Sequence, residues 1–303
     1  MRARLIFISV GLGMLLALAL ALNVEPLRQA AVYALDHPLG LLAAFAAYTA
    51  SFALRTLSWR QLMQERVPLR GLFALIMGAL FLNHAAPAKA GDLARMYALA
   101  RRGIAGERAV ASVVLSRFVD LVGLLAVLIA SWAFVGGVWG WERLTYPALF
   151  VLGATVTLPI LSRLKLPTRF EAVGRYVGRL QGALQEATWA ALLRSLAFAA
   201  PAWLLEAGIL LFVARGIGIE LSPAEVIAAT CFAVLVAAVP LTPGALGTYE
   251  AGMVAVLMSF GVAVEPAFAA AVTTHTLKFL YALAAALFAL GEGLAVVKRK
   301  GET

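Results

Sequence analysis

Long apolar runs, separated by short polar segments, dominate the hydrophobic pattern of this chain. Six of them approach or exceed the length of about 20 residues that a helix needs to cross the core of a bilayer. They cover residues 5–22, 39–57, 109–135, 144–161, 196–214 and 267–297. Because apolar residues run continuously and do not alternate with polar ones, the pattern indicates helices and not the strands of a membrane barrel. We therefore predict an all-α polytopic membrane protein with about six full transmembrane helices.

Two further apolar segments, at 72–100 and 225–260, are interrupted near their middles by proline and glycine. In each, a second short helix is expected to begin after the interruption, near Gly91 and near Gly247. Neither half is long enough to span a bilayer alone. Each segment is therefore interpreted as a re-entrant helical hairpin that enters and leaves on one side. The residues expected to shape the turns are Asn83, Pro87, Pro240, Pro243 and Gly244.

The two interrupted segments and the helices that follow them carry a related pattern, 158 residues apart. The offset relates Asp92 to Glu250, Gly103 to Gly261, Arg117 to His275 and Asp120 to Lys278. The matches fall on polar positions and glycines, which the apolar composition alone does not explain. We predict one membrane domain over 1–303, with repeat 1 at 39–136 and repeat 2 at 192–297.

The distribution of Lys and Arg predicts how the chain is oriented. If the N-terminus is inside and neither hairpin crosses, the cytoplasmic segments hold 20 of the 25 Lys and Arg, as the positive-inside rule requires. These segments are 1–4, 55–70, 89–108, 163–194 and 298–303. Both termini are then cytoplasmic in a cell (inner) membrane. The repeats begin on opposite sides, so they are inverted, an arrangement common in transporters.

Two segments have more than one interpretation. Residues 1–22 fit a retained membrane helix, because the apolar run exceeds the usual signal-peptide core of about 7–15 residues, but a signal peptide stays an alternative. Segment 163–194 alternates basic and apolar residues, which favours an amphipathic connector on the cytoplasmic membrane surface. A plain connecting loop is the alternative there.

Composition supports the membrane assignment and excludes several functions. The chain is 63% hydrophobic and 14% charged, against roughly 25% charged in soluble domains. Its net charge of +9 follows from basic residues that flank apolar segments, which predicts contact with anionic lipid and not with nucleic acid. A single cysteine, Cys231, and three scattered histidines predict no metal site. No catalytic set or cofactor motif is recognised, so we expect neither a cofactor nor enzymatic activity.

Charged residues inside the predicted spans are the first candidates for function, because charge in a bilayer is costly and usually faces a cavity or a partner. Arg117 and Asp120 share one helical face, and His275 and Lys278 occupy the related positions of the second repeat. One interpretation is an ion pair that only holds helices together. The other is a mid-membrane site that binds an anionic head group, for which arginine is well suited.

The helix starts at Gly91 and Gly247 are further candidates, since helix N-termini can bind phosphate. Asp92 and Glu250 follow them and are expected either to cap these starts or to couple transport to a proton or cation gradient. Arg95 is expected to pair with Asp92 or to face the substrate, and Glu206 is another candidate buried acid.

The segments 83–95, 117–120 and 240–250 together resemble the membrane domain of the lysylphosphatidylglycerol synthase/flippase family. The resemblance covers roughly residues 40 to 297. It implies movement of charged or glycosylated lipids between leaflets, without the cytoplasmic aminoacyl transferase of larger members. The chain departs from the family at Asp92 where Glu is usual, at Ala245 where Gly is usual, and at His275 or Lys278 where Arg is frequent.

The sequence therefore predicts a flippase-like transporter that moves an anionic or head-group-modified lipid, or a lipid-linked head group, by alternating access. Its predicted partners are membrane lipids, and the sequence leaves open whether the chain also forms a homo-oligomer. Two other functions stay open as well: an ion-coupled transporter of a small soluble anion, and a non-transporting membrane partner of a lipid-modifying enzyme.

Overall fold

The computed structural model describes residues 25–63, 67–86, 90–135, 171–238 and 242–301. Within these ranges every regular element is helical and no strand is present, which confirms the all-α prediction. The predicted spans 5–22 and 144–161 lie outside the described residues, as do Pro87 and Pro240.

Four segments of the described chain are long and apolar enough to cross a membrane. They are α3 (Pro38–Gln61), α6 (Gly106–Val135), the segment Trp189–Ile217, and Val264–Gly291 within α13 (Val264–Gly301). Each contains or largely overlaps a predicted span, and together they make this a multi-pass membrane protein. One difference is that Trp189–Ile217 consists of two helices, α9 (Trp189–Glu206) and α10 (Gly208–Ile217), which meet just after Glu206.

The two interrupted segments form pairs of shorter helices. The first pair is α4 (Leu69–Ala85) and α5 (Ala90–Ala100), and the second is α11 (Pro223–Ala237) and α12 (Thr248–Ser259), with the short turn η2 (Pro243–Ala245) between them. The 17 residues of α4 extend about 26 Å, less than the bilayer core of about 30 Å. The helices of each pair pack against one another.

One helix, α2 (Glu25–Asp36), was not predicted; it precedes the first described span. A second, α8 (Glu171–Gln185), lies within the segment 163–194, for which an amphipathic helix was one of two interpretations. Elsewhere the sequence marks helix starts clearly. Ser222 and Glu225 form a capping box at the start of α11, in which each side chain accepts a hydrogen bond from the other residue's backbone N–H.

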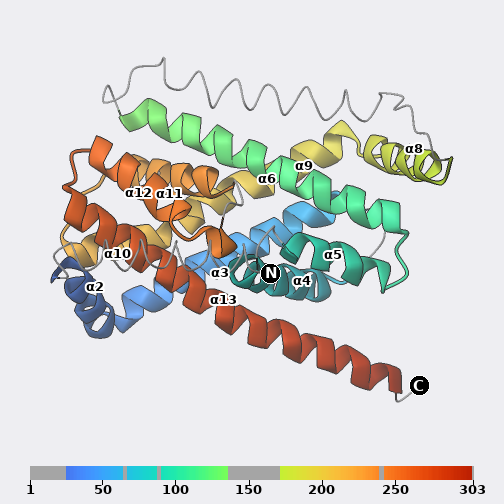
Figure 1. Ribbon diagram of the computed structural model, residues 1–303, viewed down its shortest axis with the longest axis horizontal. Helices are drawn as coiled ribbons and strands as arrows, with labels where there is room; N and C mark the ends of the chain where they lie inside the picture. Colours follow the sequence, from blue (N-terminus) through green and yellow to red (C-terminus); the bar gives the residue numbers. More distant parts are fainter. Residues whose placement is uncertain (1–24, 64–66, 87–89, 136–170, 239–241, 302–303) are drawn as a thin grey trace.

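Around the centre of the bundle, helices from one half of the chain pack against helices from the other half. α6 and α13 lie on opposite sides, green and red in Figure 1, with shorter helices between them. α3 packs along α9, while α4 packs on α13 and α11 packs on α6. Each interrupted pair therefore contacts the long helix of the other half of the chain, and residues from both halves meet at the centre.

Gly91 allows a close approach between α5 and α4. A Cβ atom at this position would lie 2.1 Å from the backbone oxygen of Ala79, which is far inside van der Waals contact. The backbone N–H of Gly91 also donates a 2.9 Å hydrogen bond to Oδ1 of Asn83. The two helices can adopt this arrangement only because residue 91 has no side chain.

The Gly91→Ala variant is expected to lose about 1–3 kcal/mol of unfolding free energy, the usual cost of overpacking. Cys231 is the sole cysteine and is fully buried, so its reaction with a thiol-reactive dye during a denaturant titration reports unfolding. Gly178→Ala in α8 is the matched control, since nothing lies within 4 Å of a Cβ there. Equal stability of the two variants would show that the α4–α5 contact tolerates a methyl group.

Candidate functional site

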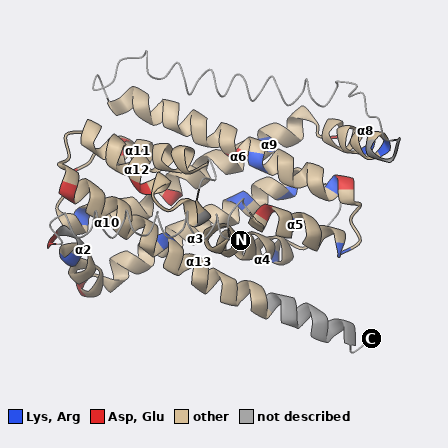
Figure 2. Ribbon diagram, viewed as in Figure 1, with Lys and Arg blue, Asp and Glu red and all other residues tan. Residues whose placement is uncertain are grey.

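A cavity of about 540 Å³ lies at the centre of the bundle, where helices from both halves of the chain meet. Its volume falls in the range of small-molecule sites, about 300–1,000 Å³. Figure 2 shows charged residues in the middle of a bundle whose helices are otherwise mostly uncharged along their lengths. Seven Lys, Arg, Asp and Glu residues in the described part of the chain line the cavity: Arg55, Arg95, Arg117, Lys278, Asp92, Asp120 and Glu206.

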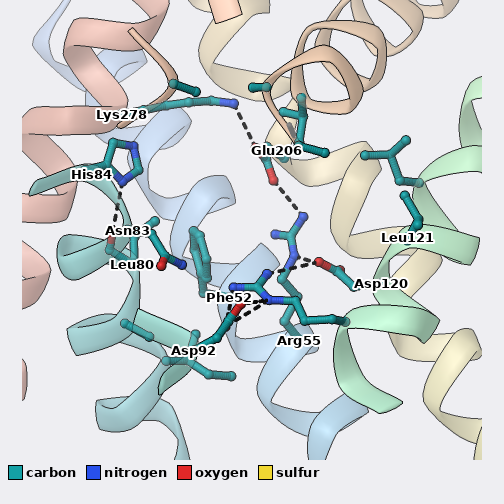
Figure 3. Close-up of a pocket in the computed structure, with 18 of the residues that line it drawn as sticks. Phe52, Arg55, Leu80, Asn83, His84, Asp92, Asp120, Leu121, Glu206 and Lys278 are labelled. Carbon is teal, nitrogen blue, oxygen red and sulfur yellow. Dashed lines mark hydrogen bonds and ion pairs between the residues drawn. The ribbon is translucent and has the colours of Figure 1, made fainter. Parts of the chain in front are cut away.

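Four of these residues form a row of ion pairs of alternating sign across four helices (Figure 3). Lys278 on α13 donates to Oε1 of Glu206 on α9 over 2.8 Å. Arg55 on α3 contacts the other Glu206 oxygen at 2.6 Å and Oδ1 of Asp120 on α6 at 3.1 Å. Because buried charges are stable only when they are paired, this row holds α13, α9, α3 and α6 together.

Arg117, which also lines the cavity, belongs to a second cluster. Its guanidinium donates two hydrogen bonds to the Asp92 carboxylate, at 2.8 and 2.9 Å, in the fork geometry that strengthens such pairs. Arg95 also contacts Asp92 at 3.2 Å, and Asp120 lies 3.8 Å from Arg117. The Arg117 side chain is 42% exposed, and the residue is one of those that line the cavity.

Arg95 has an unused hydrogen-bond donor. The residue is only 5% exposed, and its guanidinium lies over the Trp59 ring at 4.5 Å. One nitrogen donates to Ser116, but Nε is buried and has no hydrogen-bond partner among the described residues. A buried donor without a partner is costly, and a ligand oxygen in the cavity could supply the acceptor.

His275 and Glu250 form a third cluster. Nδ1 of His275 lies 2.7 Å from Oε1 of Glu250, and both residues are buried. The second oxygen of Glu250 accepts a 2.7 Å hydrogen bond from the backbone N–H of Gly247. Glu250 therefore caps the start of α12, one of the two roles that the sequence left open, and binds a histidine as well.

The structure brings most of the predicted site residues together, with three differences. Lys278 is paired with Glu206 and does not point a free charge into the cavity. Asp120 lies closer to Arg55, at 3.1 Å, than to Arg117, at 3.8 Å, with which it shares a helical face. The helix starts at Gly91 and Gly247 do not line the cavity, and their N–H groups are already bonded. The backbone N–H groups of Gly91 and Gly247 are therefore not free to bind a phosphate in the cavity, as the sequence had suggested.

Arg55 is the residue that sequence reasoning missed. It was counted with the cytoplasmic charges of 55–70, yet it lies inside α3 with its side chain only 11% exposed. Arg95, also counted as cytoplasmic, is buried too. In the structure, α3 continues through the buried residues Ser58 and Trp59, one helical turn beyond Arg55, and this places Arg55 inside the bundle.

Around the predicted turns, Asn83 and Gly244 line the cavity. Gly244 has a positive φ of 61°, and a Cβ there would lie 2.7 Å from the backbone oxygen of His84. This contact brings the turn η2 against the end of α4, and it needs glycine because side chains are disfavoured at this backbone conformation.

A charged central cavity surrounded by apolar spanning helices and interrupted helix pairs defines a polytopic membrane protein with a buried polar site. The family model described as "Lysylphosphatidylglycerol synthase TM region" matches residues 5–286, and this chain belongs to that family. The resemblance seen in the sequence is thereby confirmed. The family consists of membrane proteins related to lipid modification or translocation, and the matched region is its non-catalytic part. No curated protein and no solved structure matches the chain.

Proposed function

We propose that this protein moves an anionic or head-group-modified lipid between the two leaflets, and that the central cavity binds the head group. The observation that carries the proposal is an excess of positive charge on the cavity wall. Among the residues that the structure describes, four Lys and Arg face three carboxylates there, and each carboxylate already contacts two of the cations. These contacts are Asp92 with Arg95 and Arg117, Asp120 with Arg55 and Arg117, and Glu206 with Arg55 and Lys278.

A phosphodiester oxygen would complete this arrangement. Arg117 offers an accessible guanidinium and Arg95 offers an unused buried N–H. Arginine binds phosphate well because its planar fork reaches two oxygens at once. In this proposal Arg117 and Arg95 bind the head group, and Asp92 holds Arg117 when the site is empty. Arg55 and Glu206 join the helices that enclose the site.

Movement of the head group would follow from the duplicated architecture. We propose that 39–136 and 192–297 are inverted repeats and that the pairs α4–α5 and α11–α12 are re-entrant hairpins. This proposal is supported by the packing of each pair against the long helix of the other half of the chain. Inverted repeats allow alternating access when one unit moves against the other around a fixed site. Both termini and the connector 163–194 would face the cytoplasm.

The proposal is tested by leaflet exchange of fluorescent lipids in proteoliposomes, with phosphatidylglycerol, cardiolipin, lysylphosphatidylglycerol and phosphatidylcholine compared. We expect selective exchange of lipids that carry a phosphodiester and lack a choline group, well above the rate in empty liposomes. A parallel assay measures uptake of radiolabelled inorganic phosphate. Background exchange of every lipid combined with phosphate uptake would favour a soluble-anion transporter, and background rates in both assays would favour an enzyme partner.

A further inference from the structure

Each of the two repeats contains an ion pair at the same relative position, but the cation is an arginine in one and a histidine in the other. In the first, Arg117 on α6 contacts Asp92 on α5; in the second, His275 on α13 contacts Glu250 on α12. The partners are 25 residues apart in both cases, and the 158-residue offset relates one pair to the other. Each pair joins the second helix of an interrupted segment to the long helix that follows. The difference is a guanidinium in one repeat and an imidazole in the other.

That difference gives the second pair two charge states. A guanidinium keeps its proton at any physiological pH, so the pair Arg117–Asp92 has a fixed charge. Imidazole is the side chain whose ordinary titration falls between about pH 5 and 8. We propose that the pair His275–Glu250 is a proton-binding site, and that a bound proton and an anionic head group stabilise one another in the cavity. This inference rests on the proposed function.

The geometry defines where the proton would bind. An ionised Glu250 can only accept a hydrogen bond, so in that state Nδ1 of His275, 2.7 Å away, carries the hydrogen and the incoming proton binds Nε2. His275 is 7% exposed and lines the cavity, whereas Glu250 lies behind it. A proton can therefore reach the imidazole from the same space that a head group would occupy.

Charged and titratable groups from the pair's own helices, α12 and α13, and from two other helices, α4 and α9, surround the pair. Tyr249 of α12 has its ring 4.6 Å from that of His275, and the ring of His84 on α4 is 6.0 Å away. Lys278, one turn along α13, opposes a further positive charge but is itself paired with Glu206 of α9. Nδ1 of His84 already donates to the Leu80 carbonyl, as Figure 3 shows, so His84 is the neighbouring group from which His275 must be distinguished.

The charge balance links the proton to the head group. Among the described residues, the negative charge of Glu250, which does not line the cavity, equals the positive excess of the lining residues when His275 is neutral. A proton on His275 restores a net charge of one positive unit, which a phosphodiester neutralises. Linkage is reciprocal, so the proton strengthens head-group binding by the same factor as the head group strengthens proton binding. The consequence is proton–lipid symport.

Binding is tested by nitrogen-15 NMR of histidine-labelled protein in nanodiscs, which needs no transport. The chain has only three histidines, and His275→Asn and His37→Gln variants assign their signals. We expect the His275 signal to change with pH, and to do so at higher pH in phosphatidylglycerol than in phosphatidylcholine nanodiscs. A His275 signal that does not respond to pH, or that responds identically in both lipids, would overturn the proton site even if lipid exchange is observed.

Transport supplies the second test. Wild-type exchange of an anionic lipid is expected to be at least fivefold faster at pH 5.5 than at pH 7.5, the lower end of typical coupling factors. His275→Arg copies the first repeat and should exchange lipid at a pH-independent rate, whereas His275→Gln should exchange lipid slowly at every pH.

Two control variants, His37→Gln at an exposed residue and His84→Gln, should keep the pH profile of the wild type. Loss of pH dependence in His84→Gln with its retention in His275→Gln would assign the proton to α4 instead. Absence of exchange at every pH, together with a lipid-dependent His275 titration, would contradict transport and leave the proton site standing.

Discussion

The Arg117→Gln variant is expected to exchange anionic lipid about ten- to a hundredfold more slowly than the wild type. A hydrogen bond to a charged group contributes about 1.5–3 kcal/mol, and every 1.4 kcal/mol is about a factor of ten. The variant should still fold, because Asp92 keeps Arg95 and Asp120 keeps Arg55. The rate is measured in proteoliposomes, and the low dye reactivity of Cys231 verifies that each preparation is folded.

Two controls separate the site from general effects of losing an arginine. Arg28→Gln removes an arginine that also contacts a carboxylate, Glu25 at 2.7 Å, but on the exposed surface of α2. It should exchange lipid at the wild-type rate. Arg117→Lys keeps the charge without the planar fork and should fall between the two. If Arg117→Gln and Arg28→Gln exchange equally well, Arg117 does not bind the head group.

The Glu206→Ala variant is expected to show the largest loss of stability, about 3–5 kcal/mol, the usual cost of breaking a buried ion pair by removing one partner. Glu206 contacts both Arg55 and Lys278, and Lys278 is only 3% exposed. Its removal leaves an ammonium group without a carboxylate partner in the interior. A denaturant titration followed by Cys231 labelling measures the loss.

A double variant tests whether the unpaired charge is the cause. In Glu206→Met combined with Lys278→Met no ammonium remains, and Arg55 keeps its contact with Asp120. We expect this variant to recover most of the stability. Glu186→Ala is the control for an exposed pair, with Arg108 at 3.6 Å, and should cost less than about 1 kcal/mol. A double variant as unstable as Glu206→Ala would show that packing and not charge explains the loss.

Local physics made much of this architecture predictable. A backbone inside a bilayer must form its own hydrogen bonds, so a long apolar run can only be a helix, and four of the predicted spans are found in the described chain. The 158-residue offset between the two patterns can also be seen in the sequence, because Asp92 and Arg117 have the same spacing as Glu250 and His275. Glu206 was also recognisable as a candidate buried acid, because it is a carboxylate within an apolar run.

The sequence by itself determined the membrane class, the spanning helices, their interruptions and most of the charged residues of the cavity. Only the tertiary structure decided which charges pair. Arg55 lies at the end of an apolar run, where charge counting assigns it to the cytoplasm, but its partners are 65 and 151 residues away. Pairing of buried charges depends on how α3, α9 and α6 pack, and no spacing within one helix contains that information. The arrangement of paired charges on the cavity wall is therefore a property of the packed bundle.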